Sequence, residues 1–191
     1  MLRKYILEVV INVWQFILGL VLLVFVVGAQ SGELEVGDQA PAFELVDQYN
    51  RQHALTDYLG RWLVVYFYPR DDTPGCTAQA CAFRDDFRQL QSMQVAVLGI
   101  SLDSVASHQA FAEKHGLPFP LLSDENGKVA AAYGALWKLG PVRFARRHSF
   151  IIDPENRISR IFRSVKPARN SDEVIAELVK LGAGEEGLSN E

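Results

Sequence analysis

One stretch constrains the fold more than any other: an apolar run that ends in a turn and continues as an amphipathic helix. Residues 62–68 are mostly β-branched and aromatic, which is typical of a buried central strand. Pro74 and Gly75 follow closely, and the pattern from 76 to about 93 is helical. The apolar stripe of this helix consists of Ala80, Phe83, Phe87 and Leu90. The stretch therefore predicts a strand, a tight turn and a helix.

The rest of the chain repeats the alternation of strand and helix. The elements that we expect are short strands or turns at 43–46 and 53–59, a strand at 95–101, a helix at 104–115, a strand at 121–122, a helix at 127–133, and strands at 147–153 and 157–162. Ser171 is a good N-cap for a final helix over 172–181. Strand–helix–strand units imply parallel strands, and the turn at 153–156 adds an antiparallel hairpin. The sequence predicts an α/β fold with a central mixed β-sheet flanked by helices.

The first thirty residues differ from the rest of the chain. Arg3 and Lys4 precede an apolar stretch over 9–28. It fits either a signal peptide cleaved near 27–29 or an uncleaved membrane anchor, and both interpretations stay open. Basic residues before the stretch and acidic residues after it predict an exported, extracytoplasmic domain. The expected organisation is an N-terminal hydrophobic helix in 1–30, a linker at 31–36, a domain at 37–184 and a polar tail at 185–191.

Charge and cysteine content exclude several classes of protein. A chain of 191 residues with 49% hydrophobic content supports one domain with a substantial core, plus an appendage. A net charge of −4 gives no basic patch for nucleic acid. Two cysteines are too few for a disulfide framework, and no paired Cys/His spacing indicates zinc. We expect no metal or cofactor, so any chemistry centres on the cysteines.

Cys76 lies where the turn meets the predicted helix. A helix N-terminus carries free N–H groups and partial positive charge, so a thiol in its first turn ionises more easily. The thiolate is the reactive form of cysteine. Thr73 offers a hydroxyl nearby, which suits a small polar substrate such as a hydroperoxide. Asp71 and Asp72 oppose ionisation, so a nearby arginine is required.

Cys81 follows Cys76 by five residues, which limits the kind of redox site that the pair can form. On an intact helix this spacing puts the two Cα atoms about 9 Å apart. A disulfide needs about 4.4 to 6.8 Å. If the two cysteines bond, the helix must first unwind, which favours a bond formed during turnover over a static structural bond.

At this point the chain resembles a known family. Residues 68–84, Tyr-Pro-Arg-Asp-Asp-Thr-Pro-Gly-Cys-Thr-Ala-Gln-Ala-Cys-Ala-Phe-Arg, are similar to the active-site segment of the peroxiredoxins, in particular the peroxiredoxin Q group, or bacterioferritin comigratory proteins. Similar motifs recur in order at 99–104, 107–108, 119–124, 133–134 and 147–153. The resemblance covers about residues 34 to 183 and implies a thioredoxin-like fold.

The resemblance also implies roles for particular residues. By sequence alone the required arginine is left open among Arg70, Arg84, Arg146 and Arg147; the resemblance selects Arg147. It carries over Pro69 as a shield of the thiolate, Thr73 as a guide of the peroxide, Cys76 as the attacking residue and Cys81 as the resolving residue. Gln79 stands where many relatives have glutamate, and His148 replaces a more usual serine or threonine; we expect a supporting role for Gln79 and an ordinary strand position for His148.

The expected function is a thioredoxin-dependent peroxidase that reduces hydrogen peroxide and organic hydroperoxides. Its expected partners are the hydroperoxide, thioredoxin or a similar reductant, and a membrane if the leader is uncleaved; we expect a monomer or weak dimer. Two alternatives remain: an exported thiol–disulfide exchanger, and a redox sensor or holdase whose helix unwinds to expose Phe83 and Phe87. The C-x-x-x-x-C spacing and the Thr73 hydroxyl argue against the exchanger.

Overall fold

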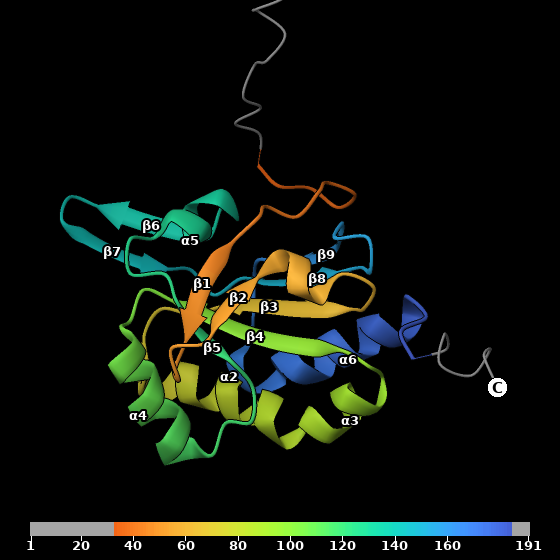
Figure 1. The fold of residues 1–191 in the computed structure, drawn as a ribbon, viewed down its shortest axis with the longest axis horizontal. Helices are drawn as coiled ribbons and strands as arrows, with labels where there is room; N and C mark the ends of the chain where they lie inside the picture. The colour runs from red at the N-terminus through yellow and green to blue at the C-terminus, as the bar shows by residue number, and fades with distance from the viewer. Residues whose placement is uncertain (1–32, 185–191) are drawn as a thin grey trace, which may run out of the picture. The chain divides into compact units, whose positions relative to one another are not determined.

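A seven-stranded mixed sheet forms the centre of the domain, in the order β2-β1-β5-β4-β3-β8-β9 (Figure 1). Strands β3, β4 and β5 pair in parallel, whereas β1, β2, β8 and β9 pair antiparallel with their neighbours. The strands are β1 (Glu44–Asp47), β2 (Gln52–Ala54), β3 (Leu63–Phe67), β4 (Ala96–Ser101), β5 (Leu121–Ser123), β6 (Leu136–Leu139), β7 (Val142–Ala145), β8 (Ser149–Ile152) and β9 (Ile158–Phe162). The predicted mixed sheet is confirmed.

This computed structural model describes residues 33–184. The predicted leader at 1–30, the start of the linker and the tail at 185–191 lie outside the described residues. Within the described part of the chain, no helix is long and apolar enough to cross a membrane.

Strand β3 lies at the middle of the sheet, as its apolar sequence predicts. All five of its residues are buried, and it pairs with β4 on one side and β8 on the other. Alternate side chains serve two separate hydrophobic cores: Val64 and Tyr66 enter one, and Leu63, Val65 and Phe67 enter the other. Because both faces of β3 are covered, the strand is apolar along its whole length.

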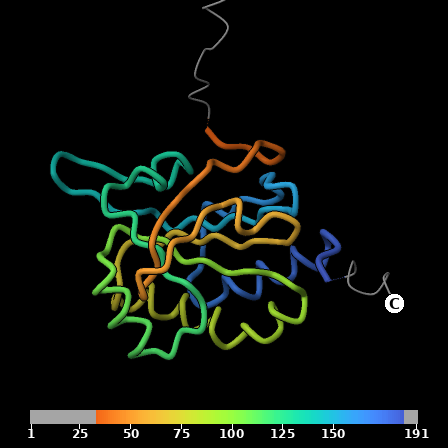
Figure 2. The backbone as a smooth tube through the Cα atoms, viewed as in Figure 1, coloured from red at the N-terminus to blue at the C-terminus, as the bar shows by residue number. Residues whose placement is uncertain are grey.

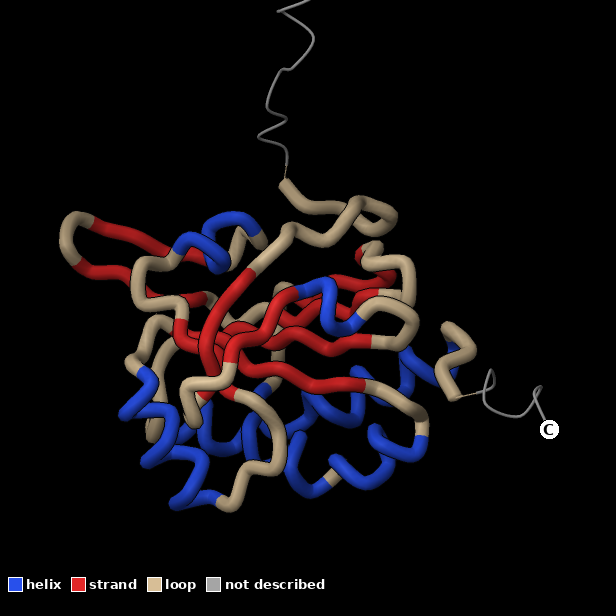
Figure 3. The backbone as a smooth tube through the Cα atoms, viewed as in Figure 1, coloured by secondary structure: helices blue, strands red, loops and turns tan. Residues whose placement is uncertain are grey.

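Most helices gather on one face of the sheet, drawn below it in Figure 3. Helices α2, α4 and α6 contribute side chains to the core on that face, and α5 contributes to the core on the other. The helices are η1 (Leu55–Tyr58), α2 (Pro74–Asp85), α3 (Phe87–Ser92), α4 (Val105–His115), α5 (Lys128–Ala132), η2 (Pro167–Arg169) and α6 (Asn170–Lys180).

Two expectations were wrong in detail, and one hairpin was missed. The single helix expected at 76–93 is two helices, α2 and α3, because the backbone turns at Asp86 (φ −90°, ψ 2°), and Phe87 then packs against Phe119. Ser171 is no N-cap, because η2 runs directly into α6 and leaves Ser171 buried in the first turn. The β6–β7 hairpin at 136–145 was not expected at all.

Candidate active site

The turn after β3 delivers Cys76 to the first turn of α2, as the sequence predicts. Pro74 opens the helix, Thr73 precedes it, and the Thr77 N–H donates to the Thr73 carbonyl at 2.9 Å. Proline suits this position because an N–H there would have no partner within the helix, so nothing is lost by its absence. Cys76 is the third residue of α2, with 1% of its surface exposed. Cys76 therefore belongs to the first turn, whose N–H groups have no partner within the helix.

Arg147 brings a positive charge to this sulfur from a segment 71 residues away in the sequence. Its Nη2 donates a hydrogen bond to Cys76 Sγ at 3.2 Å. Gly75 leaves room for this approach: a Cβ at that position would lie 3.2 Å from Arg147 Nη2, so the guanidinium would have to shift by a few tenths of an ångström. A guanidinium and a helix start together favour a charged sulfur over a neutral one.

A series of buried, hydrogen-bonded side chains holds Arg147 in place. Gln79 Oε1 accepts from Arg147 Nη1 at 2.6 Å, and Gln79 Nε2 donates to Asn170 Oδ1 at 2.7 Å. Asn170 Oδ1 also accepts from the Ser149 hydroxyl at 2.8 Å. Gln79, Asn170 and Ser149 each have 0% exposure. The arginine is thus tied to α2, α6 and β8, three elements whose own positions are fixed by the core.

A second buried network fixes the loop that precedes α2. Asp71 accepts from the Tyr68 hydroxyl at 2.8 Å and from the Ser107 hydroxyl at 2.7 Å, and it lies 2.8 Å from His108 Nδ1. Burial, with Asp71 as a second cause, raises the pKa of Tyr68 well above its usual value, so the phenol stays a donor. The Asp71 N–H donates to Asp103 at 2.9 Å. Asp71 is therefore fully engaged by its own partners.

Asp72 is engaged at the surface. It accepts from Lys114 at 2.7 Å and from His115 at 3.0 Å, and these two bonds hold its pKa below the usual range. Its φ of +57° places it in the left-handed region that aspartate tolerates better than most residues. Both carboxylates that oppose ionisation of the thiol are consequently paired with other groups.

The remaining predicted residues lie on the loop before α2 or on the helix itself. Thr73 is half-buried and its hydroxyl donates to the Arg70 carbonyl at 3.0 Å, rather than capping the helix. Pro69, also half-buried, follows closely after the end of β3. Cys81 is half-buried on α2, and both cysteines are free thiols. The helix that separates the two sulfurs is continuous, as the spacing argument assumed.

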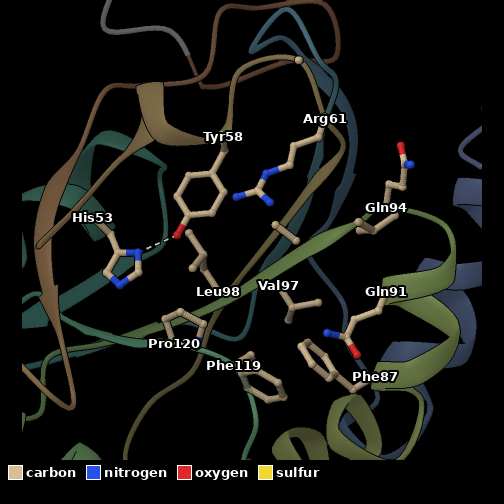
Figure 4. A pocket seen from close by; sticks show the side chains of 13 residues that line it. His53, Tyr58, Arg61, Phe87, Gln91, Gln94, Val97, Leu98, Phe119 and Pro120 are labelled. Carbon is tan, nitrogen blue, oxygen red and sulfur yellow. Dashed lines mark hydrogen bonds between the residues drawn. The ribbon is translucent and has the colours of Figure 1, made fainter. Parts of the chain in front are cut away.

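A large cavity in the described part of the chain lies away from Cys76, and it is called the hollow here. It measures about 680 Å³ and is bordered by β4, the loop before β5 and the segment around η1 (Figure 4). His53 Nδ1 lies 2.6 Å from the Tyr58 hydroxyl, and the Arg61 guanidinium lies 5.0 Å from the Tyr58 ring centroid. Burial raises the pKa of Tyr58 to about 12. None of the predicted site residues lines this hollow, so it is separate from the group of residues around Cys76.

Sequence reasoning missed three residues of the site. Asn170, Ser149 and His108 were not expected to support it, although 107–108 belongs to a matching motif. No local pattern signals the first two, since each is an ordinary polar residue beside an element boundary. His148, expected at a bland strand position, is buried just before β8 and meets Phe150 edge-on at 6.5 Å.

Comparison with known proteins gives consistent matches. The AhpC/TSA family matches residues 36–161. The chain is 42% identical over 151 residues to a putative peroxiredoxin bcp of Coxiella burnetii, covering 76% of this chain and 99% of that protein. It is 41% identical over 139 residues to peroxiredoxin Bcp of Bacillus subtilis, covering 70% and 87%.

Solved structures give the same result. Peroxidoxin BcpB of Mycobacterium tuberculosis matches with a TM-score of 0.74 and 32% identity, over 78% of this chain and 98% of that one. A cysteine-to-serine mutant of Xylella fastidiosa PrxQ matches with a TM-score of 0.74 and 32% identity, over 80% and 99%. The expected thioredoxin-like fold is thereby confirmed. The chain belongs to the AhpC/TSA family of peroxiredoxins, within the peroxiredoxin Q/Bcp group.

Proposed function

We propose that this thiol peroxidase reduces hydrogen peroxide and organic hydroperoxides through Cys76, with Cys81 as the resolving residue. The observation that carries the proposal is the 3.2 Å contact between Arg147 Nη2 and Cys76 Sγ at the start of α2. A guanidinium in that position stabilises the thiolate and also offers donors to the oxygens of a bound peroxide. Pro69 would shield the sulfur from water, and Thr73 would orient the peroxide.

The first step is a displacement at oxygen. The Cys76 thiolate attacks the terminal peroxide oxygen, so an S–O bond forms while the O–O bond breaks. The leaving oxygen takes the electron pair and a proton, and departs as water or an alcohol. Cys76 becomes a sulfenic acid and the peroxide is reduced by two electrons. Negative charge moves from sulfur to the leaving oxygen in this step, and the donors of Arg147 can stabilise it there.

The second step joins the two sulfurs of the chain. The Cys81 thiol condenses with the Cys76 sulfenic acid, which forms an S–S bond and releases water. Both residues lie on the intact α2, so this helix must unwind locally before they meet. A disulfide that requires such unwinding is compatible with a bond that forms and breaks in each cycle.

The third step needs an outside dithiol. Thioredoxin or a thioredoxin-like protein would exchange with the Cys76–Cys81 disulfide, which restores both thiols and leaves the donor oxidised. The apolar leader supports a domain at 37–184 that acts outside the cytoplasm, with residues 1–30 as a signal peptide or anchor. A monomer or weak dimer remains our expectation.

Peroxide consumption with a thioredoxin system tests the proposal. Cys76→Ser should abolish turnover, while a serine at Cys81 should stop the enzyme at the sulfenic acid unless an added thiol resolves it. Multiple turnover of the Cys81 variant with thioredoxin at the unaltered rate would refute the resolving role. Reduction of a protein disulfide without any peroxide activity would favour the exchanger, and peroxide oxidation without turnover would favour the sensor.

A further inference from the structure

The β6–β7 hairpin projects from the rest of the domain (Figure 2) and has two unlike faces. Trp137 pairs with Phe144 and Leu139 pairs with Val142, and because side chains alternate along a strand these four lie on one face. The Trp137 and Phe144 rings stack at 4.7 Å. Leu139 and Val142, beside the turn, are 69% and 56% exposed. One face of the hairpin is entirely apolar.

The opposite face attaches the hairpin to the domain. Leu136 packs against the core, and Arg143 donates to the carbonyls of Asn126 and Glu125, both at 3.0 Å. Trp137 and Phe144, by contrast, belong to neither hydrophobic core of the described residues. Trp137 and Phe144 are half-buried and stack on each other, so the exposed part of the apolar face is its tip, Leu139 and Val142.

The segment of the chain that carries this face is basic. Between residues 126 and 152 the sequence contains five lysines and arginines and no aspartate or glutamate, in a chain whose net charge is −4. Lys138 and Arg143 lie directly opposite each other in the hairpin and are exposed, and Arg146 follows at its base, also exposed. Lys138 and Arg143 lie on the face opposite the apolar one, so their attraction to a membrane would act over a distance rather than by direct contact. An apolar tip and stacked aromatic rings in a basic segment suit the interface of an anionic membrane.

We propose that the apolar face of the β6–β7 hairpin docks on the surface of an anionic lipid bilayer. A second copy of the chain suits this face less well. Four side chains are few against the roughly 800 Å² per partner of a stable interface. The sequence prediction that 9–28 meets a membrane points to the same occupant.

Docking would also place the reactive site near the membrane. Strand β7 ends at Ala145, and Arg147 follows two residues later, with its guanidinium on Cys76. A hairpin held in the headgroup region would therefore keep the segment that carries Arg147 at the membrane surface. This is a property of the domain itself and does not require the leader.

Vesicle binding by a chain that begins at Leu34 tests the proposal without the leader. This part closes its own two cores, and relatives that it covers to 98% or 99% adopt the same fold. The probes are vesicles of phosphatidylcholine alone and of phosphatidylcholine with phosphatidylglycerol, separated by flotation. In a Trp62→Phe background Trp137 is the remaining tryptophan of this shortened chain, so its emission reports on the hairpin.

We expect binding to the anionic vesicles, with a blue shift of Trp137 emission and a fall in binding as salt rises. The double variant Leu139→Ser, Val142→Ser should bind at least about tenfold more weakly, because each buried apolar side chain contributes about that factor. Lys138→Glu should weaken binding to anionic vesicles by roughly fivefold or more. Leu59→Ser is the matched control, since Leu59 is 56% exposed on another part of the domain.

Three results would overturn the proposal. One is the absence of binding to anionic vesicles, and another is equal binding by the Leu139/Val142 double variant. The third is self-association of the shortened chain in sedimentation velocity that this double variant abolishes, which would assign the face to a second copy. Circular dichroism of each variant confirms the fold, and because no peroxide is present the outcome is independent of the proposed reaction.

Discussion

Replacement of Gln79 by leucine tests whether the buried bridge between α2 and α6 positions Arg147. Leucine has similar bulk but can form neither of the two hydrogen bonds that Gln79 makes, to Arg147 at 2.6 Å and to Asn170 at 2.7 Å. The guanidinium would lose this anchor, so its contact with Cys76 would no longer be fixed. We expect slower attack on peroxide, since the donors of Arg147 would no longer be held at the sulfur.

The size of the effect follows from the bonds that are lost. A hydrogen bond to a charged group contributes about 1.5–3 kcal/mol, and a neutral one about 0.5–1.5 kcal/mol. If the whole charged contribution acts in the transition state, the second-order rate constant with peroxide falls by about 10- to 150-fold, which is a ceiling. Both losses act on folding, so the free energy of unfolding should fall by about 2–4 kcal/mol.

Stopped-flow oxidation by hydrogen peroxide measures the rate, and urea denaturation measures the stability. Gln52→Leu is the control, because the Gln52 side chain bonds to the exposed Glu44 at the sheet edge, away from the site. The Gln79→Leu change should have little further effect on the rate in an Arg147→Gln background. The reasoning fails if the folded Gln79 variant reacts within twofold of the parent, or if its effect persists in full without the arginine.

Three further perturbations have defined outcomes. Burial raises the pKa of Asp47, but hydrogen bonds from the backbone N–H groups of Arg51 and Tyr49 outweigh it and leave the pKa lowered. Ionised Asp47 therefore stabilises the fold above the pKa of the unfolded chain, and this stabilisation is lost as the pH falls through the lower pKa of the folded chain. Asp47→Asn should therefore cost about 1–3 kcal/mol of unfolding free energy near pH 7 and much less in acid, as urea titrations at both pH values would show. After one equivalent of peroxide, intact mass should show loss of two hydrogens in the parent and gain of one oxygen in Cys81→Ser; a parent that gains oxygen contradicts the resolving step. Gly75→Ala should slow peroxide reduction roughly tenfold, because the added methyl crowds the guanidinium 3.2 Å away. An unaltered rate would show that Arg147 can shift to accommodate the methyl group and still act on Cys76.

Local patterns in the sequence were sufficient for the centre of the fold. The apolar run at 62–68 could only be a strand covered on both faces, and Pro74 with Gly75 marked the start of the helix that presents Cys76. The break at Asp86 could not be foreseen, because α2 and α3 continue one apolar stripe. The β6–β7 hairpin was missed because its alternation extends over only four residues in each strand.

The support of the site depends on contacts that no local pattern encodes. Gln79 and Asn170 are 91 residues apart, and Arg147 reaches Cys76 across 71 residues. By sequence alone four arginines were equally suitable partners for the thiol, and only the resemblance favoured Arg147. Physical reasoning could require a cation at the sulfur, but tertiary structure decides which residue provides it.

Gln79 lies between the two cysteines along α2, and this has a consequence for the whole cycle. Unwinding 76–81 to join the sulfurs would break the hydrogen bonds of Gln79 to Arg147 and Asn170. Oxidation would therefore disrupt the arrangement of side chains that had just reacted with the peroxide. Peroxide and reductant would then never compete for one surface: the folded helix would receive the first, and the opened segment would receive the second. Each cycle would rebuild its own binding site only after the electrons had been delivered.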